Sequence, residues 1–288
     1  MNNKDVPRGS GIRWPGGKRI AVMLTFDFDA ELLQKTHIGL KDQKAGFTDL
    51  ERGRYAACEG LDRCLRVLDE NAVKATFFVP GYVAETYATQ TREIFNRGHE
   101  LAYHGYMHEA VRGIPAEEEE RIMERGEAAL EKITGKRPVG HRAPYGLLHP
   151  DAPALMRRRG YLYSSSMKDC DWAYLHEDGG RPVVELPTDS IVDDFTYFFF
   201  SLCYPAHRVA YTNEEFFETL RDEFDGLADE GDKILCVKLH PQLIGRAGRA
   251  RALGEFIGYV QARGAWVATC EEVAGYVLEN SKKEAGTV

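Results

Sequence analysis

Short apolar runs alternate with amphipathic stretches along nearly the whole chain, and this alternation most constrains the fold. The apolar runs are rich in β-branched and aromatic residues, as fully buried strands are. They cover residues 20–26, 74–79, 100–103, 183–186, 234–239 and 265–269. Helical periodicity lies between them, over residues 58–71, 82–96, 115–134, 152–159, 212–229, 251–263 and 271–281. The alternation predicts an α/β fold with a mainly parallel sheet, open or closed into a barrel.

No internal repeat or low-complexity linker interrupts the 288 residues, so we expect a single domain over residues 1–288. Residues 32–55 show weak periodicity and predict a long loop over one face of the fold, where loops are often functional. Residues 168–181 and 201–212 also lack periodicity and are candidate pocket walls. Asn213 is a plausible cap of the helix that follows.

Composition and charge exclude several classes of partner. The formal charge of −8 lacks the footprint of a nucleic-acid binder. The longest apolar stretch near the start, residues 20–24, is far below the roughly 20 residues of a bilayer crossing. With no hydrophobic core of a secretory signal before Ser10, we expect a cytoplasmic protein without a membrane partner. The six cysteines form no Cys-x-x-Cys pair, which favours buried free thiols.

Polar side chains follow three of the expected strands at the point where each strand ends, and a fourth polar group follows a further strand expected before Arg142. In α/β folds the loops at the carboxyl ends of the strands build the active site. The candidates are Asp27 and Asp29, His104 and His108, Arg142 and Tyr145, and His240.

Asp27 and Asp29 flank Phe28, so in an extended strand their side chains point to the same side. Phe26, Phe28 and Ala30 would then point to the other side. Two carboxylates this close raise one pKa unless a cation lies nearby, which favours metal ligation or a general base. An exposed strand end or a helix cap is the alternative.

His104 and His108 have the spacing His-x-x-x-His, which on a helical turn places both imidazoles on one face. Such a pair alone is more often incidental than metal-binding. A carboxylate from another strand end would complete an Asp-His-His set with open coordination positions. Imidazole and carboxylate ligands suit zinc, cobalt, iron, nickel or manganese, and zinc is our default.

A three-ligand site with room for water would lower the pKa of that water to about 7 and polarise a carbonyl, which is hydrolase chemistry. Asp27 is then the candidate base, and His240 the candidate acid that protonates a leaving nitrogen. Arg142 would hold Asp27 ionised, and the backbone amide of Tyr145 is a candidate oxyanion donor. The alternatives are a core or capping histidine at position 240 and an ordinary turn at residues 140–146.

These residues, in this order, resemble the NodB-homology polysaccharide deacetylase superfamily, whose first motif pairs a base Asp with a metal-binding Asp and whose second is His-x-x-x-His. The first motif has Phe28 inserted between the two aspartates. This form of the motif resembles the branch of cytosolic peptidoglycan-deacetylase-like proteins, cyclic imide hydrolases and allantoinase relatives. The resemblance covers a core of about residues 14–276. Further segments that fit this branch are residues 14–17, 53–55, 75–81, 98–100, 171–172, 185–187 and 240–242.

The resemblance implies a distorted, TIM-barrel-like (β/α) barrel of about seven units that assembles as a homo-oligomer, a dimer or tetramer. It implies metal ligands at Asp29, His104 and His108, a base at Asp27, an arginine at Arg142 that orients it, and an acid at His240. We assign Tyr145, Trp172 and Glu31 to substrate binding. Tyr106 and Met107, between the histidines, depart from the usual polar residues and bear on substrate choice rather than on the ligands.

The expected function is metal-dependent hydrolysis of a non-peptide carbon–nitrogen bond. A small cyclic imide or ureide is favoured, because no secretion signal is visible and residues 32–55 and 195–200 could roof a closed pocket, although they could instead fill an oligomer interface. One alternative is an N-deacetylase of N-acetylated sugar in polysaccharide or peptidoglycan. The other is a barrel that binds sugars or amides without catalysis.

Overall fold

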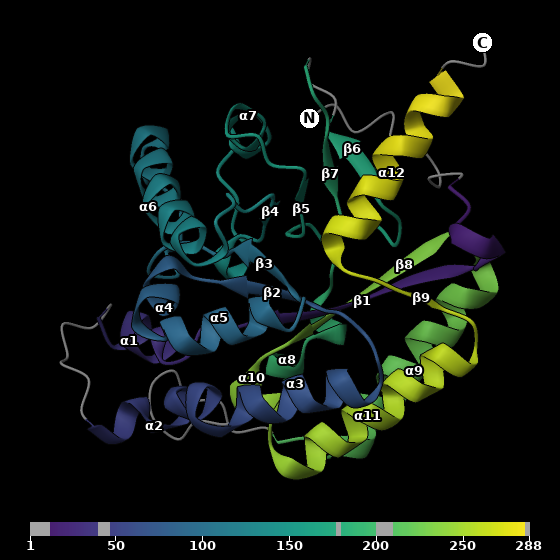
Figure 1. Ribbon diagram of the computed structural model, residues 1–288, viewed down its shortest axis with the longest axis horizontal. Helices are drawn as coiled ribbons and strands as arrows, with labels where there is room; N and C mark the ends of the chain where they lie inside the picture. The colour runs from purple at the N-terminus through teal and green to yellow at the C-terminus, as the bar shows by residue number, and fades with distance from the viewer. Residues whose placement is uncertain (1–11, 40–46, 177–179, 200–209, 286–288) are drawn as a thin grey trace.

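A curled, mostly parallel sheet forms the centre of the computed structural model (Figure 1). The structure describes residues 12–39, 47–176, 180–199 and 210–285. The sheet has nine strands in this part of the chain, hydrogen-bonded in the order β6-β7-β5-β4-β3-β2-β1-β8, with β9 beside β1. The strands are β1 (Ile20–Asp27), β2 (Thr76–Val79), β3 (Glu100–Tyr103), β4 (Gly140–His141), β5 (Tyr163–Ser164), β6 (Tyr174–His176), β7 (Val183–Glu185), β8 (Lys233–Leu239) and β9 (Trp266–Val267).

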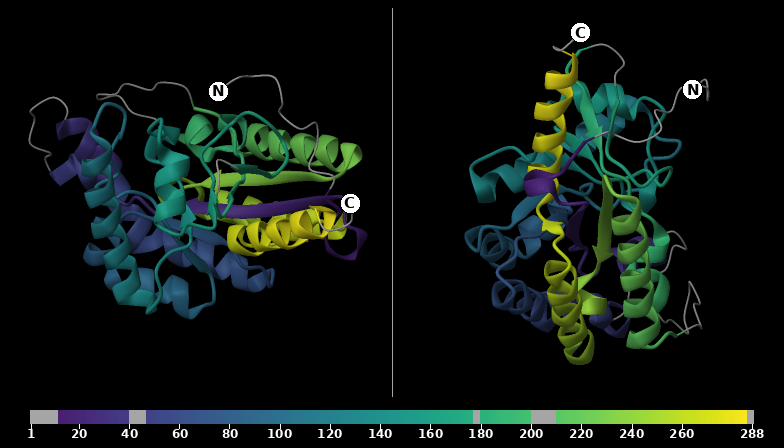
Figure 2. Two further views of the ribbon diagram at one scale, coloured as in Figure 1. Left: turned by 90° about the horizontal axis from the view of Figure 1, so that it is seen from above. Right: turned by 90° about the vertical axis from the view of Figure 1, so that its right-hand side faces the viewer.

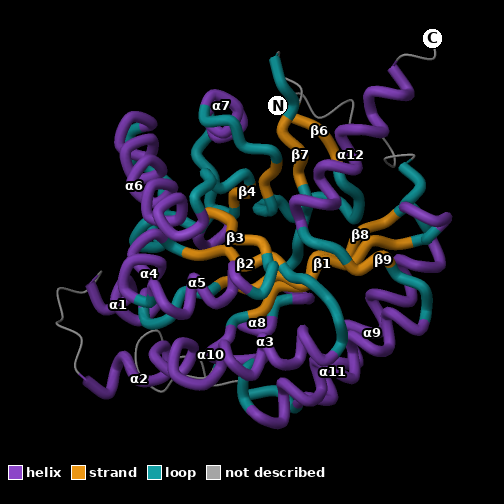
Figure 3. Tube along the Cα trace, viewed as in Figure 1, coloured by secondary structure: helices purple, strands orange, loops and turns teal. Residues whose placement is uncertain are grey.

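Neighbouring strands run parallel, except that β6 pairs antiparallel with β7. Among the described residues β8 and β6 end the hydrogen-bonded order, so the sheet curls without closing. This confirms the predicted α/β class and the distorted barrel. Figure 3 shows the strands side by side at the centre, surrounded by helices and loops.

The helices connect successive strands and cover the sheet. Figure 2 shows α9 and α12 on opposite sides of β1 and β8. The helices are α1 (Leu32–Gly39), α2 (Phe47–Tyr55), α3 (Leu61–Glu70), α4 (Gly81–Thr86), α5 (Ala88–Asn96), α6 (Ala116–Thr134), α7 (Ala152–Arg158), α8 (Asp194–Phe198), α9 (Asn213–Glu230), α10 (Pro241–Ile244), α11 (Ala247–Ala262) and α12 (Cys270–Ala285). No helix in the described ranges is both long and apolar enough to span a bilayer.

β1 is buried along its whole length, which explains its continuous apolar sequence. Its alternate side chains enter two different clusters. Ala21 and Met23 pack inside the curl of the sheet, whereas Leu24 and Phe26 pack in the larger cluster under the helices. The strand therefore ends with Asp27 on the inner side, as the period of two requires.

The segment predicted as a long loop, residues 32–55, is instead largely helical. It contains α1 and α2, while residues 40–46 lie outside the described part. The weak apolar periodicity hid these helices because tertiary packing stabilises them. A Cβ added to Gly53 in α2 would lie 2.4 Å from the Cα of Glu31, so only glycine permits this approach.

Two further predictions needed correction. The expected helix over residues 82–96 divides into α4 and α5 at Tyr87, whose φ and ψ of −115° and 46° are not helical. The cap of α9 is Thr212 rather than Asn213. Glu215 donates its backbone N–H to the Thr212 hydroxyl, and its carboxylate accepts the Thr212 N–H, which forms a capping box.

The turn after β8 is held in place by close backbone packing. Residues Ala56–Gly60 form a π-helical turn against α10. A Cβ on Gly60 would lie 2.1 Å from the carbonyl oxygen of Pro241. This approach fixes the start of α10, which directly follows His240.

Candidate metal and catalytic site

A cavity of about 180 Å³ lies at the carboxyl end of the sheet. Residues at or beyond the ends of β1, β3, β4 and β8 line it, as expected for a parallel sheet. Seven predicted site residues meet there: Asp27, Asp29, His104, His108, Arg142, Tyr145 and His240.

Asp29, His104 and His108 bring potential ligand atoms within 4.8 Å of one another. Asp29 Oδ1 lies 3.6 Å from His104 Nε2 and 3.9 Å from His108 Nε2. All three side chains are buried. Neither carboxylate oxygen of Asp29 has a hydrogen-bond partner among the described residues. Burial raises the pKa of Asp29, so a charged carboxylate here requires a cation, and the donor set fits a divalent metal.

The tautomer of His104 follows from its backbone contact. Its Nδ1 lies 2.8 Å from the carbonyl oxygen of Arg142, which can only accept a hydrogen bond. The proton is therefore on Nδ1 in the neutral ring, and the lone pair of Nε2 faces Asp29. Such an outer contact is how proteins orient a histidine ligand.

His104 and His108 lie in a loop, so the predicted helical turn is wrong. Gly105 and His108 have φ values of 78° and 59°, which no α-helix allows. Glu109 stabilises the loop by accepting the backbone N–H groups of Tyr106 and Met107 at 3.0 and 2.8 Å. The loop nevertheless brings the two imidazole centroids within 5.0 Å.

Asp27 and Arg142 form a buried ion pair, as predicted. Arg142 Nη1 donates to Asp27 Oδ1 at 2.7 Å. Burial raises the pKa of Asp27, but the positive charges around it, of which Arg142 contributes most, together outweigh burial and hold that pKa well below its usual range. The remaining donors of Arg142 bind the carbonyl oxygen of Ser165 at 3.0 Å, the Ser165 hydroxyl at 2.9 Å, the Thr25 hydroxyl at 2.9 Å and Cys236 Sγ at 3.4 Å.

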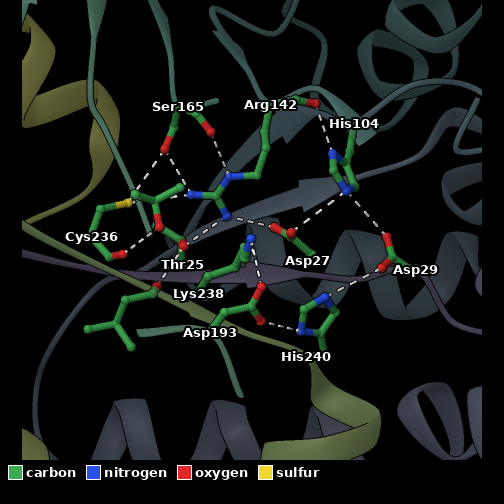
Figure 4. A network of polar contacts seen from close by, with 12 residues as sticks. Thr25, Asp27, Asp29, His104, Arg142, Ser165, Asp193, Cys236, Lys238 and His240 are labelled. Atoms are coloured by element: carbon green, nitrogen blue, oxygen red, sulfur yellow. Dashed lines mark hydrogen bonds and ion pairs between the residues drawn. The ribbon is translucent and has the colours of Figure 1, made fainter. Parts of the chain in front are cut away.

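His240 faces the metal-ligand cluster from the other side of the cavity (Figure 4). Its Nε2 lies 3.8 Å from Asp29 Oδ2, and its Nδ1 lies 2.7 Å from Asp194 Oδ1. Burial lowers the pKa of His240, but the charge and hydrogen bond of Asp194 outweigh it and raise the pKa to about 9. His240 is therefore protonated near neutral pH, as a proton donor must be.

Asp193, Asp194 and His240 form a second close group of potential ligand atoms. Asp194 accepts the backbone N–H of His240 at 3.0 Å in addition to its contact with Nδ1. Asp193 contacts Lys238 Nζ at 2.7 Å. These contacts already engage both acids, so we interpret the group as an acid–carboxylate pair rather than a metal site.

The three predicted substrate-binding residues have different outcomes. Tyr145 lines the cavity, with its ring centroid 4.5 Å from that of His108. Glu31 does not belong to the described cavity wall: it is buried beside Lys35 and accepts a hydrogen bond from Tyr87 at 2.7 Å. These contacts connect Glu31 to α1 and to Tyr87, which follows α4.

Trp172 also lies outside the described cavity wall, so its expected place as a pocket wall is wrong. Its ring packs on Lys233 Nζ, 4.9 Å from the centroid, at the start of β8. His240 follows the other end of that strand, roughly 20 Å away by strand rise. Of the expected wall over residues 168–181, Lys168 does line the cavity. The segment then crosses to the amino end of the sheet, where the carbonyl oxygen of Asp171 accepts the N–H of Ile234. Of the other expected wall, residues 201–209 lie outside the described part.

Sequence reasoning missed Asp193, Asp194 and Lys238, which also belong to this region. Two adjacent aspartates directly before an aromatic run were the available signal for the first two. Lys238 interrupts an otherwise apolar strand two residues before His240, and this interruption was its signal.

Known proteins resemble this chain in sequence and in fold. The sequence model of the family Polysaccharide deacetylase matches residues 53–164. A solved structure from Mycobacterium smegmatis, assigned to the polysaccharide deacetylases, is 36% identical over 94% of each chain, with a TM-score of 0.88. The PuuE allantoinase structure, 24% identical over 94% of each chain with a TM-score of 0.80, shares the fold. The peptidoglycan deacetylase-like protein of Gibberella zeae is 28% identical over 89% of this chain and 86% of that protein.

Proposed function

This chain belongs to the polysaccharide deacetylase family of hydrolases, and from that premise we propose that it hydrolyses a small cyclic imide or ureide with the help of a divalent metal. One observation supports the proposal most strongly. A carboxylate held ionised by Arg142 and an imidazole held protonated by Asp194 lie on two sides of the Asp29, His104 and His108 cluster. Hydrolysis of an amide needs a base and an acid in such an arrangement.

The proposed mechanism assigns one role to each group. A divalent metal, for which zinc remains our default, would be held by Asp29, His104 and His108 and would supply Lewis acidity that activates water and polarises the scissile carbonyl. Asp27 accepts the proton of the attacking water. His240 donates a proton to the leaving nitrogen as the carbon–nitrogen bond breaks.

The size of the cavity supports a small substrate. A void of about 150 Å³ holds a ligand the size of benzene, so about 180 Å³ suits a five- or six-membered ring. Leu33 from α1 and Phe195 from α8 supply apolar walls. They come from the two segments expected to roof the pocket.

An N-deacetylase of N-acetylated sugar is the second candidate. It is favoured by the names of relatives that match most of this chain, such as the peptidoglycan deacetylase of Helicobacter pylori, 26% identical over 80% of this chain and 86% of that protein. The same base, acid and ligands would serve that reaction, so the two candidates differ in substrate and not in machinery.

The test is hydrolysis by metal-reconstituted protein of succinimide and, in parallel, of a short N-acetylglucosamine oligomer. We expect ring opening of succinimide that stops when a chelator is added. Acetate release from the sugar without imide opening would contradict the substrate that we propose and establish the deacetylase. Light scattering on the same sample tests the proposed homo-oligomer, and a monomer would exclude it.

A further inference from the structure

Lys238 and Asp193 form an ion pair in the cavity wall that the proposed mechanism does not use. Lys238 Nζ lies 2.7 Å from Asp193 Oδ2. The two side chains are 16% and 11% exposed, so both are largely withdrawn from solvent. Figure 4 shows the pair next to His240. A charged pair in this place makes one wall of a small cavity polar.

The pair is held on the His240 side of the cavity. Lys238 precedes His240 by two residues, and the period of a strand puts both side chains on the same side. Asp193 Oδ1 accepts the backbone N–H of Phe195 at 2.9 Å and lies 3.7 Å from His240 Nδ1. The backbones of Asp193 and Lys238 also form a β-bridge. The position of the ammonium group is thus set by backbone contacts on both sides.

The ammonium group has donors left for a ligand. A lysine has three N–H donors, and within the described residues the contact of Lys238 Nζ is with Asp193. An acetyl methyl group against this wall would remove water from the Lys238 ammonium group without offering a hydrogen-bond acceptor in its place. A carbonyl oxygen would instead accept a charge-assisted hydrogen bond, which is about twice as strong as a neutral one.

In an imide or ureide the scissile nitrogen carries a second carbonyl, whereas in an N-acetylated sugar it carries a ring carbon. His240 must face that nitrogen to protonate it, so the second carbonyl lies on the same side of the cavity. Resting on the function proposed above, we propose that Lys238, held by Asp193, donates a hydrogen bond to this second carbonyl and selects imides and ureides over simple acetamides.

The proposed contact also assists the reaction. The water oxygen forms a bond to the attacked carbonyl carbon, and the carbon–nitrogen bond breaks with its electron pair on nitrogen. That pair is delocalised onto the second carbonyl, whose oxygen faces Lys238. His240 then gives its proton to nitrogen, so a cyclic imide yields a carboxylate and a primary amide in one molecule. Lys238 keeps its own proton throughout.

The experiment compares Lys238→Met with a matched control, Lys233→Met. Lys233 lies on the same strand, is 15% exposed and pairs with Glu230 at 2.8 Å, but at the opposite end of the sheet. The two small molecules are a matched pair as well. Succinimide is the substrate, and 2-pyrrolidinone, the same ring without the second carbonyl, is a competitive inhibitor. Metal content and thermal unfolding are measured for each variant.

We expect Lys238→Met to lower kcat/KM for succinimide by about 10- to 100-fold, the value of a hydrogen bond to a charged group. Its inhibition constant for 2-pyrrolidinone should stay within about threefold of wild type, and Lys233→Met should leave both values unchanged. Lys238→Gln, which retains a neutral donor, should lose less and replaces the methionine variant if that variant does not fold.

Two results would overturn the inference while the proposed function stands. They are an unchanged kcat/KM for succinimide in Lys238→Met, or a parallel loss for succinimide and 2-pyrrolidinone, which a merely structural lysine would produce. Wild-type protein that is inert toward succinimide but active on the acetylated sugar would refute the proposed substrate, and the inference with it.

Discussion

Replacing Arg142 with methionine should destabilise the protein through Asp27, and the effect can be calculated from the buried pair. Both side chains are nearly fully buried, with exposed fractions of 2% and 5%. Removing one partner of a buried ion pair leaves an uncompensated charge and costs about 3–5 kcal/mol. We therefore expect Arg142→Met to lower the free energy of unfolding by that amount at pH 7.

The pH dependence follows from the sign of the pKa change. In the wild type the folded-state pKa of Asp27 lies below the unfolded value, so the pair contributes stability above about pH 4 that is lost only in stronger acid. Without Arg142, less positive charge opposes the effect of burial, so the folded-state pKa of Asp27 rises. Folded Arg142→Met therefore takes up a proton on Asp27 at a higher pH than folded wild type does. Below that pH the difference in free energy of unfolding between the variant and wild type shrinks, by up to about 1.4 kcal/mol per pH unit.

The assay is urea unfolding followed by circular dichroism at pH 7 and pH 5, with chelator present so that metal binding does not contribute. Asp27→Asn in the Arg142→Met background should recover about 2 kcal/mol or more, because it removes the stranded charge. Arg263→Met, which breaks an exposed pair with Asp225 at 3.3 Å, is the control and should cost at most about 1 kcal/mol. A double variant no more stable than Arg142→Met alone would refute the reasoning.

Three further predictions concern the site and its surroundings. Asp194→Asn removes the charge that raises the pKa of His240 to about 9, so the alkaline limb of the kcat profile should move down to about pH 6.5 or below; an unmoved limb would argue against His240 as the acid. Asp29→Asn should abolish binding of the divalent metal, measured by elemental analysis after dialysis, and full retention of metal would exclude Asp29 as a ligand. Trp172→Phe should leave KM for succinimide within about twofold and change stability by less than about 1 kcal/mol, since a phenyl ring can still pack on Lys233 at the amino end of the sheet; a large rise in KM would return this residue to the substrate site.

Features that depend on interactions between residues near in the sequence were predictable, and features that depend on distant contacts were not. Strands such as β1 and β8 were predictable because a buried parallel strand leaves a continuous apolar run, which is a local signal. The convergence of Asp27, Asp29 and His240 was predictable for a related reason. Each lies at the end of a strand or within two residues of it, and parallel strands bring their carboxyl ends to one edge.

Tertiary contacts alone decided the rest. Helix α2 forms because Gly53 allows the chain to pack on the backbone of Glu31, a contact that periodicity does not record. Asp194 reaches His240 because the start of α8 packs on β8, across 46 residues of sequence.

The path of the aperiodic segment that carries Trp172 could not be predicted from the sequence either. Trp172 lies at the amino end of the sheet because the backbone of Asp171 pairs with β8 there. The sequence by itself thus determined the fold class and which candidate site residues meet at one edge of the sheet, because both follow from local patterns and from the ends of strands. Only the tertiary structure decided that Asp194 orients His240, because that contact depends on two distant parts of the backbone meeting.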